Sequence, residues 1–303
     1  MTNAPIVLFA YNRPTHLAST LAALSACPEW RGSPVYVYCD GPRSTFDEQL
    51  VEETRRVARG IAHPDAHVIA ADVNLGLANS IIKGVGQLCE QFGRVVVIED
   101  DLLVSPSFLS YMNRALECYA ARPEVLQISG YMFDVPEFRD RMRVLLMPLT
   151  TTWGWATWKR AWDLFKPDDD GWLRMRQNKQ ERRIFNLGNN YDFFSMLEAQ
   201  ASGKRDSWGI RWYWSVFSAK GLVCHPPRTL VANAGMDGSG TNGRGRFRSF
   251  SGTRSAPSEL LPEMAAGDVR CSEAEWSAVK HAIWRQNGGY LGRAIDVLKS
   301  IVR

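Results

Sequence analysis

The sequence predicts an α/β fold in which a mostly parallel sheet is flanked by helices. In the first hundred residues, short apolar segments typical of strands alternate with longer segments whose apolar residues recur at helical spacing. Polar residues or glycines follow each strand segment. Strands joined by helical crossovers run parallel, so these polar ends should gather at one edge of the sheet, where open α/β sheets bind ligands.

The predicted order of elements is βαβαβαβ. The expected strands are 5–10, 35–39, 66–71 and 95–98. The expected helices are 14–26, 46–60 and 77–92. The polar strand ends are Asn12 with Arg13, Asp40 with Gly41, residues 74–76 and residues 99–101.

The fourth strand is the most informative segment, because four β-branched apolar residues lead directly into Glu99, Asp100 and Asp101. A strand buried on both faces reads as a continuous apolar run, which puts the acidic triplet at its carboxyl end. Adjacent carboxylates repel one another, and Mg²⁺ or Mn²⁺ offsets that cost. Asp101 is therefore a candidate metal ligand, and the cation would hold a pyrophosphate. A solvated acidic turn is the alternative.

Composition indicates one or two globular domains, since 303 residues with 45% apolar content can bury a substantial core. No apolar run approaches the roughly 18 to 20 residues of a membrane span, and no signal peptide is evident, so we expect a cytoplasmic protein. The six cysteines lack zinc-like spacing, as expected of reduced thiols. A net charge of +4 is compatible with anionic substrates or a membrane surface, and we expect no nucleic-acid partner.

Six short motifs occur in order between residues 5 and 243: FAYNRP at 9–14, DG at 40–41, NLGLAN at 74–79, EDD at 99–101, WGW at 153–155 and DSW at 206–208. Together they resemble glycosyltransferases of the GT-A fold, especially bacterial family 2-like enzymes and, more distantly, N-acetylglucosaminyltransferase I. The resemblance implies a Rossmann-like mixed sheet and an inverting enzyme of polysaccharide biosynthesis. It would use Mn²⁺ or Mg²⁺ to transfer a sugar, a hexosyl or N-acetylhexosaminyl group, from a UDP-sugar to a glycan or glycolipid.

The resemblance also implies roles for individual residues. Asp101 would bind the metal, Asp40 would accept a hydrogen bond from the nucleotide base, and Asp100 would lie near the ribose. The full set expected at the nucleotide is Tyr11, Arg13, Asp40, Asn74, Lys83 and Asp100. The set expected at the donor or acceptor sugar is Glu99, Trp153, Gly154, Trp155 and Trp208.

Asp206 is the predicted catalytic base, because a single carboxylate can take the proton of the acceptor hydroxyl. The alternative role for Asp206 is a helix N-cap or a turn. N-acetylglucosaminyltransferase I has paired aspartates before its Trp and uses the second as base, a position that Ser207 holds here. Asp192 is the reserve candidate.

Eight of the eleven tryptophans lie between Trp153 and Trp214. Aromatic faces stack on the apolar face of a pyranose, so this cluster suits an acceptor site. Trp155, Trp158 and Trp162 recur at helical spacing, which favours the core. In the WGW motif, Gly154 would let the backbone approach a ligand closely.

Residues 235–254 contain six glycines and four arginines, which predicts a basic lid that orders around a diphosphate; an exposed loop is the alternative. The GxGxxG pattern at Gly238, Gly240 and Gly243 is no dinucleotide fingerprint, because no helix pattern follows it. The acidic run 168–170 should cap or solvate a loop. The five histidines show no ligand spacing, so we treat them as structural or surface residues.

We expect a catalytic domain at 1–250, with a nucleotide-binding half at 1–130 and an acceptor half at 131–250. A helical extension should follow at 251–303, with one helix starting near Ser272 and a last helix at 290–303. These helices should pack on the catalytic domain; peripheral binding to the inner membrane face is the alternative. A noncatalytic carbohydrate-binding or scaffold protein with the same fold is the competing hypothesis for function. The tryptophan-rich second half argues against a nucleotidyltransferase.

Overall fold

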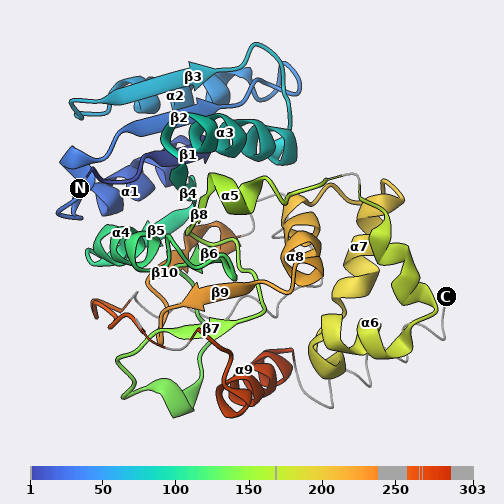
Figure 1. The fold of residues 1–303 in the computed structure, drawn as a ribbon. Coiled ribbons are helices and arrows are strands. Elements are labelled where there is room, and N and C mark those ends of the chain that lie inside the picture. Colours follow the sequence, from blue (N-terminus) through green and yellow to red (C-terminus); the bar gives the residue numbers. More distant parts are fainter. Residues whose placement is uncertain (1, 168, 238–257, 266, 268, 288–303) are drawn as a thin grey trace.

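A computed structural model describes residues 2–167, 169–237, 258–265, 267 and 269–287. Figure 1 shows a central sheet with helices on both faces and a smaller helical lobe beside it. The fold is therefore α/β with a mixed sheet, as the sequence predicts.

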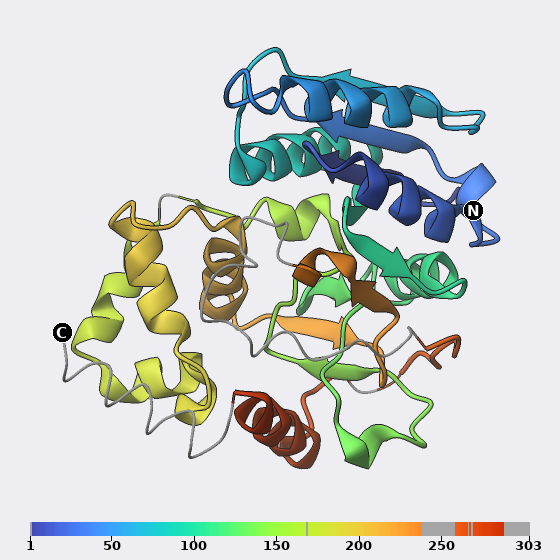
Figure 2. The same cartoon turned by 180° about the vertical axis from the view of Figure 1, so that it is seen from behind.

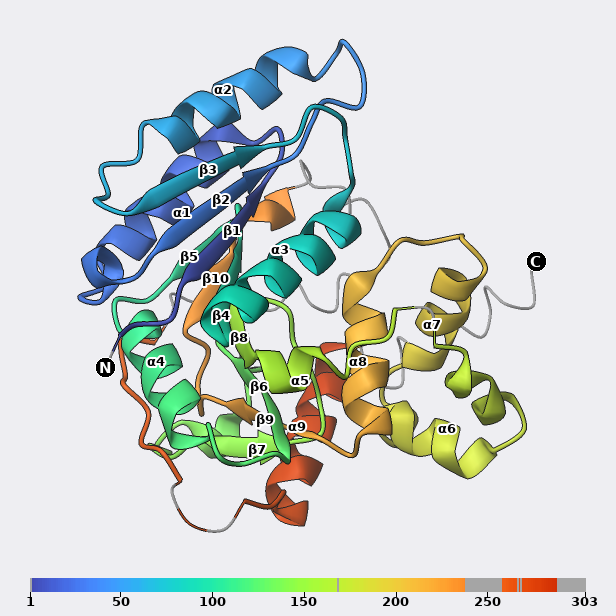
Figure 3. The same cartoon turned by 45° about the horizontal axis from the view of Figure 1, so that its top comes forward.

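The first half of the chain follows the predicted order closely. Its elements are β1 (Ile6–Ala10), α1 (Pro14–Ser25), β2 (Val35–Cys39), α2 (Glu48–Arg59), β3 (Ala66–Ala70), α3 (Leu77–Phe92) and β4 (Arg94–Glu99). Strand β1 pairs in parallel with both β2 and β4, and β2 pairs in parallel with β3. Helices α1 and α2 lie on one face of these strands and α3 lies on the other (Figures 2 and 3). This arrangement confirms the parallel crossovers predicted from the sequence.

The second half adds shorter elements. They are β5 (Leu102–Val104), α4 (Phe108–Cys118), β6 (Val125–Ser129), β7 (Leu145–Met147), β8 (Trp155–Trp158), α5 (Lys159–Trp162), α6 (Lys179–Phe185), α7 (Phe193–Ala201), α8 (Trp208–Ser218), β9 (Leu222–His225), β10 (Val231–Asn233) and α9 (Glu273–Gln286). Five short 3₁₀ helices complete the described elements: η1 (Trp30–Gly32), η2 (Pro136–Phe138), η3 (Gly171–Arg176), η4 (Leu187–Asn189) and η5 (Ala234–Asp237).

One large sheet joins the two halves in the order β3-β2-β1-β4-β8-β6-β9-β7. Strand β8 is antiparallel to both β4 and β6, which makes the sheet mixed. Strands β5 and β10 form a separate antiparallel pair. Because β5 directly follows the acidic triplet, this pair brings the chain around residue 234 next to the end of β4.

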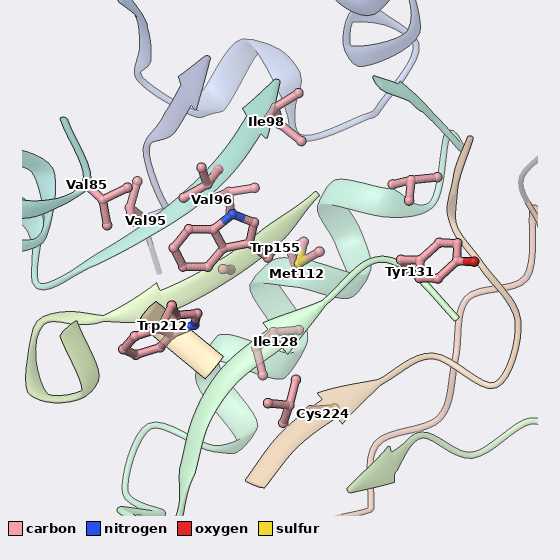
Figure 4. Packing of buried hydrophobic residues seen from close by; sticks show 14 of the residues in the cluster. Val85, Val95, Val96, Ile98, Met112, Ile128, Tyr131, Trp155, Trp212 and Cys224 are labelled. Carbon is pink, nitrogen blue, oxygen red and sulfur yellow. The ribbon is translucent and has the colours of Figure 1, made fainter. Parts of the chain in front are cut away.

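Strand β4 lies at the centre of the core. Val95, Val96, Val97 and Ile98 are all buried, as a strand covered on both faces requires. Helix α3 packs beside it through Ile81, Val85 and Leu88 and ends at Gly93, whose φ of 74° is the left-handed conformation that glycine adopts readily. Figure 4 shows the ring of Trp155 next to Val96, with the ring of Trp212 on the other side of Trp155.

The tryptophans at 155, 158 and 162 are buried, which confirms that they belong to the core. The spacing argument behind that prediction was wrong, because Trp155 and Trp158 lie on strand β8 and only Trp162 lies on a helix. Trp155 stacks on Trp208 with ring centroids 5.2 Å apart and also packs near Trp212. The aromatic cluster therefore fills the interior between β8 and α8.

Helix α9 begins at the predicted place. Ser272 is its N-cap and accepts a hydrogen bond from the Glu275 N–H, while Val279 and Ile283 are buried. An ion pair of 2.5 Å joins Arg141 to Glu275. The helix therefore packs on the rest of the chain. The last predicted helix, 290–303, lies outside the described residues.

Within the described part of the chain, no helix is long and apolar enough to cross a membrane. All six cysteines are free thiols, which confirms the absence of a disulfide framework. His225 is fully buried, with its ring nitrogens against the Tyr131 and Leu149 carbonyl oxygens, which fits the structural role expected of it.

Candidate active site

The carboxyl ends of β1 and β4 bring four predicted residues together. The Tyr11 N–H donates to the Asp100 carboxylate at 3.3 Å. Arg13 donates through Nη1 to Asp101 Oδ2 at 2.8 Å, and the same nitrogen lies 3.7 Å from Asp100 Oδ1. The polar strand ends thus meet at one edge of the sheet, as the parallel order requires.

The acidic triplet is electrostatically strained. Burial raises the pKa of Glu99 to about 8, and the charges of Asp101 and Asp100 push it in the same direction. Burial, followed by the charge of Asp101, raises the pKa of Asp100 to about 7. Arg13 opposes both shifts but does not cancel them. Additional positive charge at this position would therefore favour the ionised carboxylates.

The residues at this edge fit a divalent cation that is bound together with a diphosphate. The described residues contain no group of three or more His, Cys, Asp or Glu side chains placed to hold a metal by themselves. Magnesium, however, is usually held by one or two carboxylates plus substrate phosphates, and Asp101 can supply one of them. Nε and Nη2 of Arg13 are buried and make no hydrogen bond within the described structure. These two donors suit a phosphate group.

Asp40 has a structural role that the sequence analysis missed. Its carboxylate accepts hydrogen bonds from the backbone N–H groups of Gly41 at 2.9 Å, Leu75 at 2.8 Å and Gly76 at 2.9 Å. The Asn74 side chain donates to the Gly41 carbonyl at 2.7 Å. Asp40 and Asn74 therefore join the loop after β2 to the loop before α3. A contact from Asp40 to a nucleotide base stays a prediction.

Tyr11 belongs to a small network that includes two residues missed by the sequence analysis, Arg43 and Asp47. The Tyr11 hydroxyl donates to the Asp47 carboxylate, and the Arg43 guanidinium lies 5.1 Å from the centre of the Tyr11 ring. Burial raises the pKa of Tyr11 to about 12, whereas the bond from Tyr11 lowers that of Asp47 to about 2. Arg43 also donates to Asn74 at 3.4 Å. The predicted residue Lys83 is exposed in the second turn of α3.

The start of the predicted lid rests on the acidic edge. The Ala234 N–H donates to the Asp101 carbonyl at 2.8 Å. A Cβ atom added to Gly235 would collide with the Asp101 carboxylate and with Nη2 of Arg13. Only glycine fits here without displacing these side chains. Residues 238–254, which hold the GxGxxG pattern and most of the predicted lid, lie outside the described residues.

The two candidate bases have different surroundings. Asp206 is exposed and pairs with Arg211, whose Nη2 lies 3.3 Å from its Oδ1. A Cβ atom on Gly76 would lie 3.9 Å from Asp206 Oδ2, so this carboxylate faces the loop that Asp40 holds. The N-cap of α8 is Ser207, not Asp206, so the capping alternative for Asp206 was wrong.

Asp192 is the N-cap of α7. Its carboxylate accepts hydrogen bonds from the Ser195 N–H at 3.2 Å, the Ser195 hydroxyl at 2.6 Å and the Asn186 side chain at 3.1 Å. Capping a helix accounts for an aspartate at this position. The assignment of the base to Asp206 or Asp192 stays a prediction.

The predicted sugar contacts are divided between core and surface. Trp155 is fully buried and Trp208 nearly so, and each packs against the other; a sugar contact of either residue stays a prediction. Trp153 is half-buried and lies edge-on to Tyr131. Gly154, with a φ of 60°, lies against Phe108, so the close approach that it permits is to the protein itself.

A mixed α/β sheet with acidic and cationic side chains at its ligand edge is the arrangement expected of the GT-A fold. The family model described as "Glycosyltransferase like family 2" matches residues 4–161, more than half of the chain. The chain belongs to this family and is a glycosyltransferase. The comparison with curated proteins found no match.

Several solved glycosyltransferases are distantly similar to this chain. The mannosyltransferase PcManGT from Pyrobaculum calidifontis, solved with GDP-Man and Mn²⁺, is 13% identical over 72% of this chain and 75% of its own, with a TM-score of 0.38. The galactosyltransferase LgtC, solved with donor and acceptor sugar analogs, is 11% identical over 73% of this chain and 72% of its own, with a TM-score of 0.39. Glucosyl-3-phosphoglycerate synthase from Mycobacterium tuberculosis, solved with Mn²⁺ and UDP, is 13% identical over 54% and 58%, with a TM-score of 0.34.

Proposed function

We propose that this glycosyltransferase is an inverting, metal-dependent enzyme that moves a sugar from a UDP-sugar to a hydroxyl of a glycan or lipid-linked glycan. The observation that carries the proposal is the pairing of Arg13 with Asp100 and Asp101 at the carboxyl end of β4. A carboxylate and a guanidinium with two unused donors together match a cation and a diphosphate.

At the donor, Asp101 would hold Mn²⁺ or Mg²⁺, and Arg13 would turn its Nε and Nη2 toward the diphosphate. When bound, the cation would neutralise the negative charge that builds up on the leaving phosphate. Asp100 lies one residue away, bonded to the Tyr11 backbone, which is where a ribose beside the diphosphate would need an acceptor. Glu99, still half-buried, would face the donor sugar.

At the acceptor, Asp206 would take the proton of the attacking hydroxyl. Its carboxylate is exposed, so an acceptor can reach it, and Arg211 Nη2 lies 3.3 Å from its Oδ1. Attack from the face opposite the leaving diphosphate inverts the anomeric centre, and a single carboxylate is sufficient for this reaction. The loop before α3 lies between Asp206 and Asp40, so donor and acceptor would meet there.

A thermal-shift screen of nucleotide sugars, with and without Mn²⁺, tests the proposal, since a ligand that binds only the folded state raises apparent stability by mass action. We expect a UDP-sugar to raise the melting temperature only when Mn²⁺ is present. Asp101→Asn should abolish the shift, whereas Asp72→Asn, an exposed aspartate before the Asn74 loop, should not.

The products of a reaction with the stabilising donor then separate the two hypotheses for function. Released UDP together with a glycosylated acceptor, of inverted anomeric configuration, would support the proposal. Donor binding with neither transfer nor donor hydrolysis across an acceptor panel would favour the noncatalytic alternative. A metal-independent shift would contradict the role given to Asp101.

A further inference from the structure

A cavity of about 600 Å³ lies between the loop after α5, the end of α7 and α8, and we call it the α7–α8 cavity. Its volume is within the roughly 300–1,000 Å³ that is typical of small-molecule sites. The described residues that line it include none of the residues assigned above to the donor or to catalysis. Figure 1 shows α7 and α8 side by side in the helical lobe.

Arg211 connects the α7–α8 cavity to the proposed base. Its side chain lines the cavity, while Nη2 lies 3.3 Å from Asp206 Oδ1 and Nε donates to the Ser207 carbonyl at 3.4 Å. Gln200, a second lining residue, accepts a hydrogen bond from the Ser207 N–H. The segment that carries Asp206 is thus held by two residues of the cavity wall. Arg211 therefore contacts both the cavity and the carboxylate of Asp206.

The wall has an apolar part that is held rigidly. Leu173, which is 38% exposed, is the large apolar side chain of the wall that a ligand can reach, whereas Trp172 and Trp214 are nearly buried. The Trp214 Nε1–H donates to Asp169 at 2.7 Å, and Asp169 also accepts from the Gly171 N–H at 3.1 Å. Asp169 thus orders a loop, as predicted for the acidic run, and fixes the indole. The exposed part of Leu173 can pack against the apolar C–H face of a sugar ring.

The polar part of the wall carries no net charge among the described residues. Three side chains are cationic and three are anionic: Lys166, Arg176, Arg211, Asp169, Asp170 and Glu198. Arg176 pairs with Glu198 at 3.0 Å. An anionic ligand would face as many carboxylates as cations, whereas hydroxyl groups can donate to carboxylates and accept from guanidiniums. The wall therefore matches a neutral polyhydroxylated ligand better than a phosphate or a uronate.

We propose that the α7–α8 cavity binds the acceptor, a neutral saccharide, and presents its hydroxyl to Asp206. This inference rests on the proposed function, because it gives the acceptor class for the same reaction. The exposed apolar side chain of Leu173, the balanced charges of the described wall residues and the ion pair from Arg211 to the base support it.

The test uses the full chain with UDP and Mn²⁺ on an array of immobilised oligosaccharides, some neutral and some containing uronate. Ser202→Trp and Leu173→Trp each fill the cavity from an exposed position. Ser218→Trp, at the exposed far end of α8, is the matched control for an added indole. We expect neutral glycans to be retained by the wild type and the control, and about tenfold less by both cavity variants, a difference of about 1.4 kcal/mol.

Calorimetric binding of UDP with Mn²⁺ should be equal in all four proteins, which shows that the cavity variants fold and keep the donor site. Three results would overturn the inference. The wild type could retain only acidic glycans, it could retain no neutral glycan, or both cavity variants could retain neutral glycans as well as the wild type does. Failure of the wild type to bind UDP would instead contradict the proposed function. Repeating the array without UDP shows whether glycans are retained independently of the donor, which distinguishes failure of the inference from failure of the proposed function.

Discussion

Asp40→Asn tests whether the Asp40 carboxylate mainly holds the two loops together or mainly serves the nucleotide. The substitution keeps the size of the side chain but turns one oxygen into an NH₂ group, which cannot accept a hydrogen bond. In its best orientation the amide keeps the bonds from Gly41 and Leu75 and leaves the Gly76 N–H without an acceptor. An unsatisfied buried N–H costs about 1–3 kcal/mol, and the remaining bonds lose the benefit of a charged acceptor. We expect a loss of about 2–4 kcal/mol in the free energy of unfolding.

For a chain of this size, each kcal/mol lowers the melting temperature by roughly 1.5–2 °C, so the expected shift is roughly 3–8 °C. Thermal and urea unfolding followed by circular dichroism measure it, with Asp72→Asn as the exposed control from the same region. Calorimetry with UDP and Mn²⁺ gives the nucleotide affinity at a temperature where both proteins are folded. A variant that unfolds like the wild type but no longer binds UDP would refute the structural reasoning and make Asp40 a direct ligand of the base.

Four further outcomes follow from the site. Asp101→Asn should remove metal-dependent binding of UDP and most transfer while leaving the melting temperature within a few degrees; calorimetry that finds unchanged binding would contradict the metal assignment. Asp206→Asn should keep donor binding and reduce transfer by about a hundredfold or more, the usual effect of losing a general base, whereas Asp192→Asn should mainly lower stability by about 1 kcal/mol through loss of a cap; the reverse result would make Asp192 the base. Gly235→Ala should cost about 1–3 kcal/mol of stability, because its Cβ collides with the Asp101 carboxylate, and an unfolding curve identical to that of the wild type would show that the contact is not maintained in solution. Glu99→Gln should remove a pH dependence: the raised pKa of Glu99 gives a contribution to stability that is fully present below about pH 4.5 and is lost progressively as the pH rises to about 8, so the variant should gain stability over the wild type across that range and keep a constant advantage above it.

Much of the nucleotide-binding half could be predicted because its signals are local. Strand β4 is a run of β-branched residues, and α3 repeats its apolar residues at helical spacing between glycines. If helical crossovers make β1 and β4 parallel, their carboxyl ends lie at the same edge of the sheet. Arg13 and Asp101 then meet there, even though they are 88 residues apart in the sequence.

The remainder depends on contacts that no short window of sequence contains. Trp155 and Trp158 lie on β8, which is antiparallel to its neighbours β4 and β6. The three-residue spacing of these tryptophans is typical of a helix and was therefore misleading. Asp40 looked like a ligand residue because it follows a strand, yet its partners come from a loop more than thirty residues later. For Asp47 there was a usable signal: it lies three residues after Ser44, and its carboxylate accepts from the Ser44 N–H as in a local turn.

Arg13 also bears on how the chain reaches its native state. Many small metalloproteins fold only when their metal binds, because metal binding supplies the free energy of folding. Here the guanidinium is a counter-ion supplied by the chain itself, already seated between Asp100 and Asp101. The ion pairs of Arg13 should therefore allow the chain to fold without a metal. A chelator should remove the proposed metal-dependent activity and leave the folded protein intact, and the activity should return fully when the cation is added back.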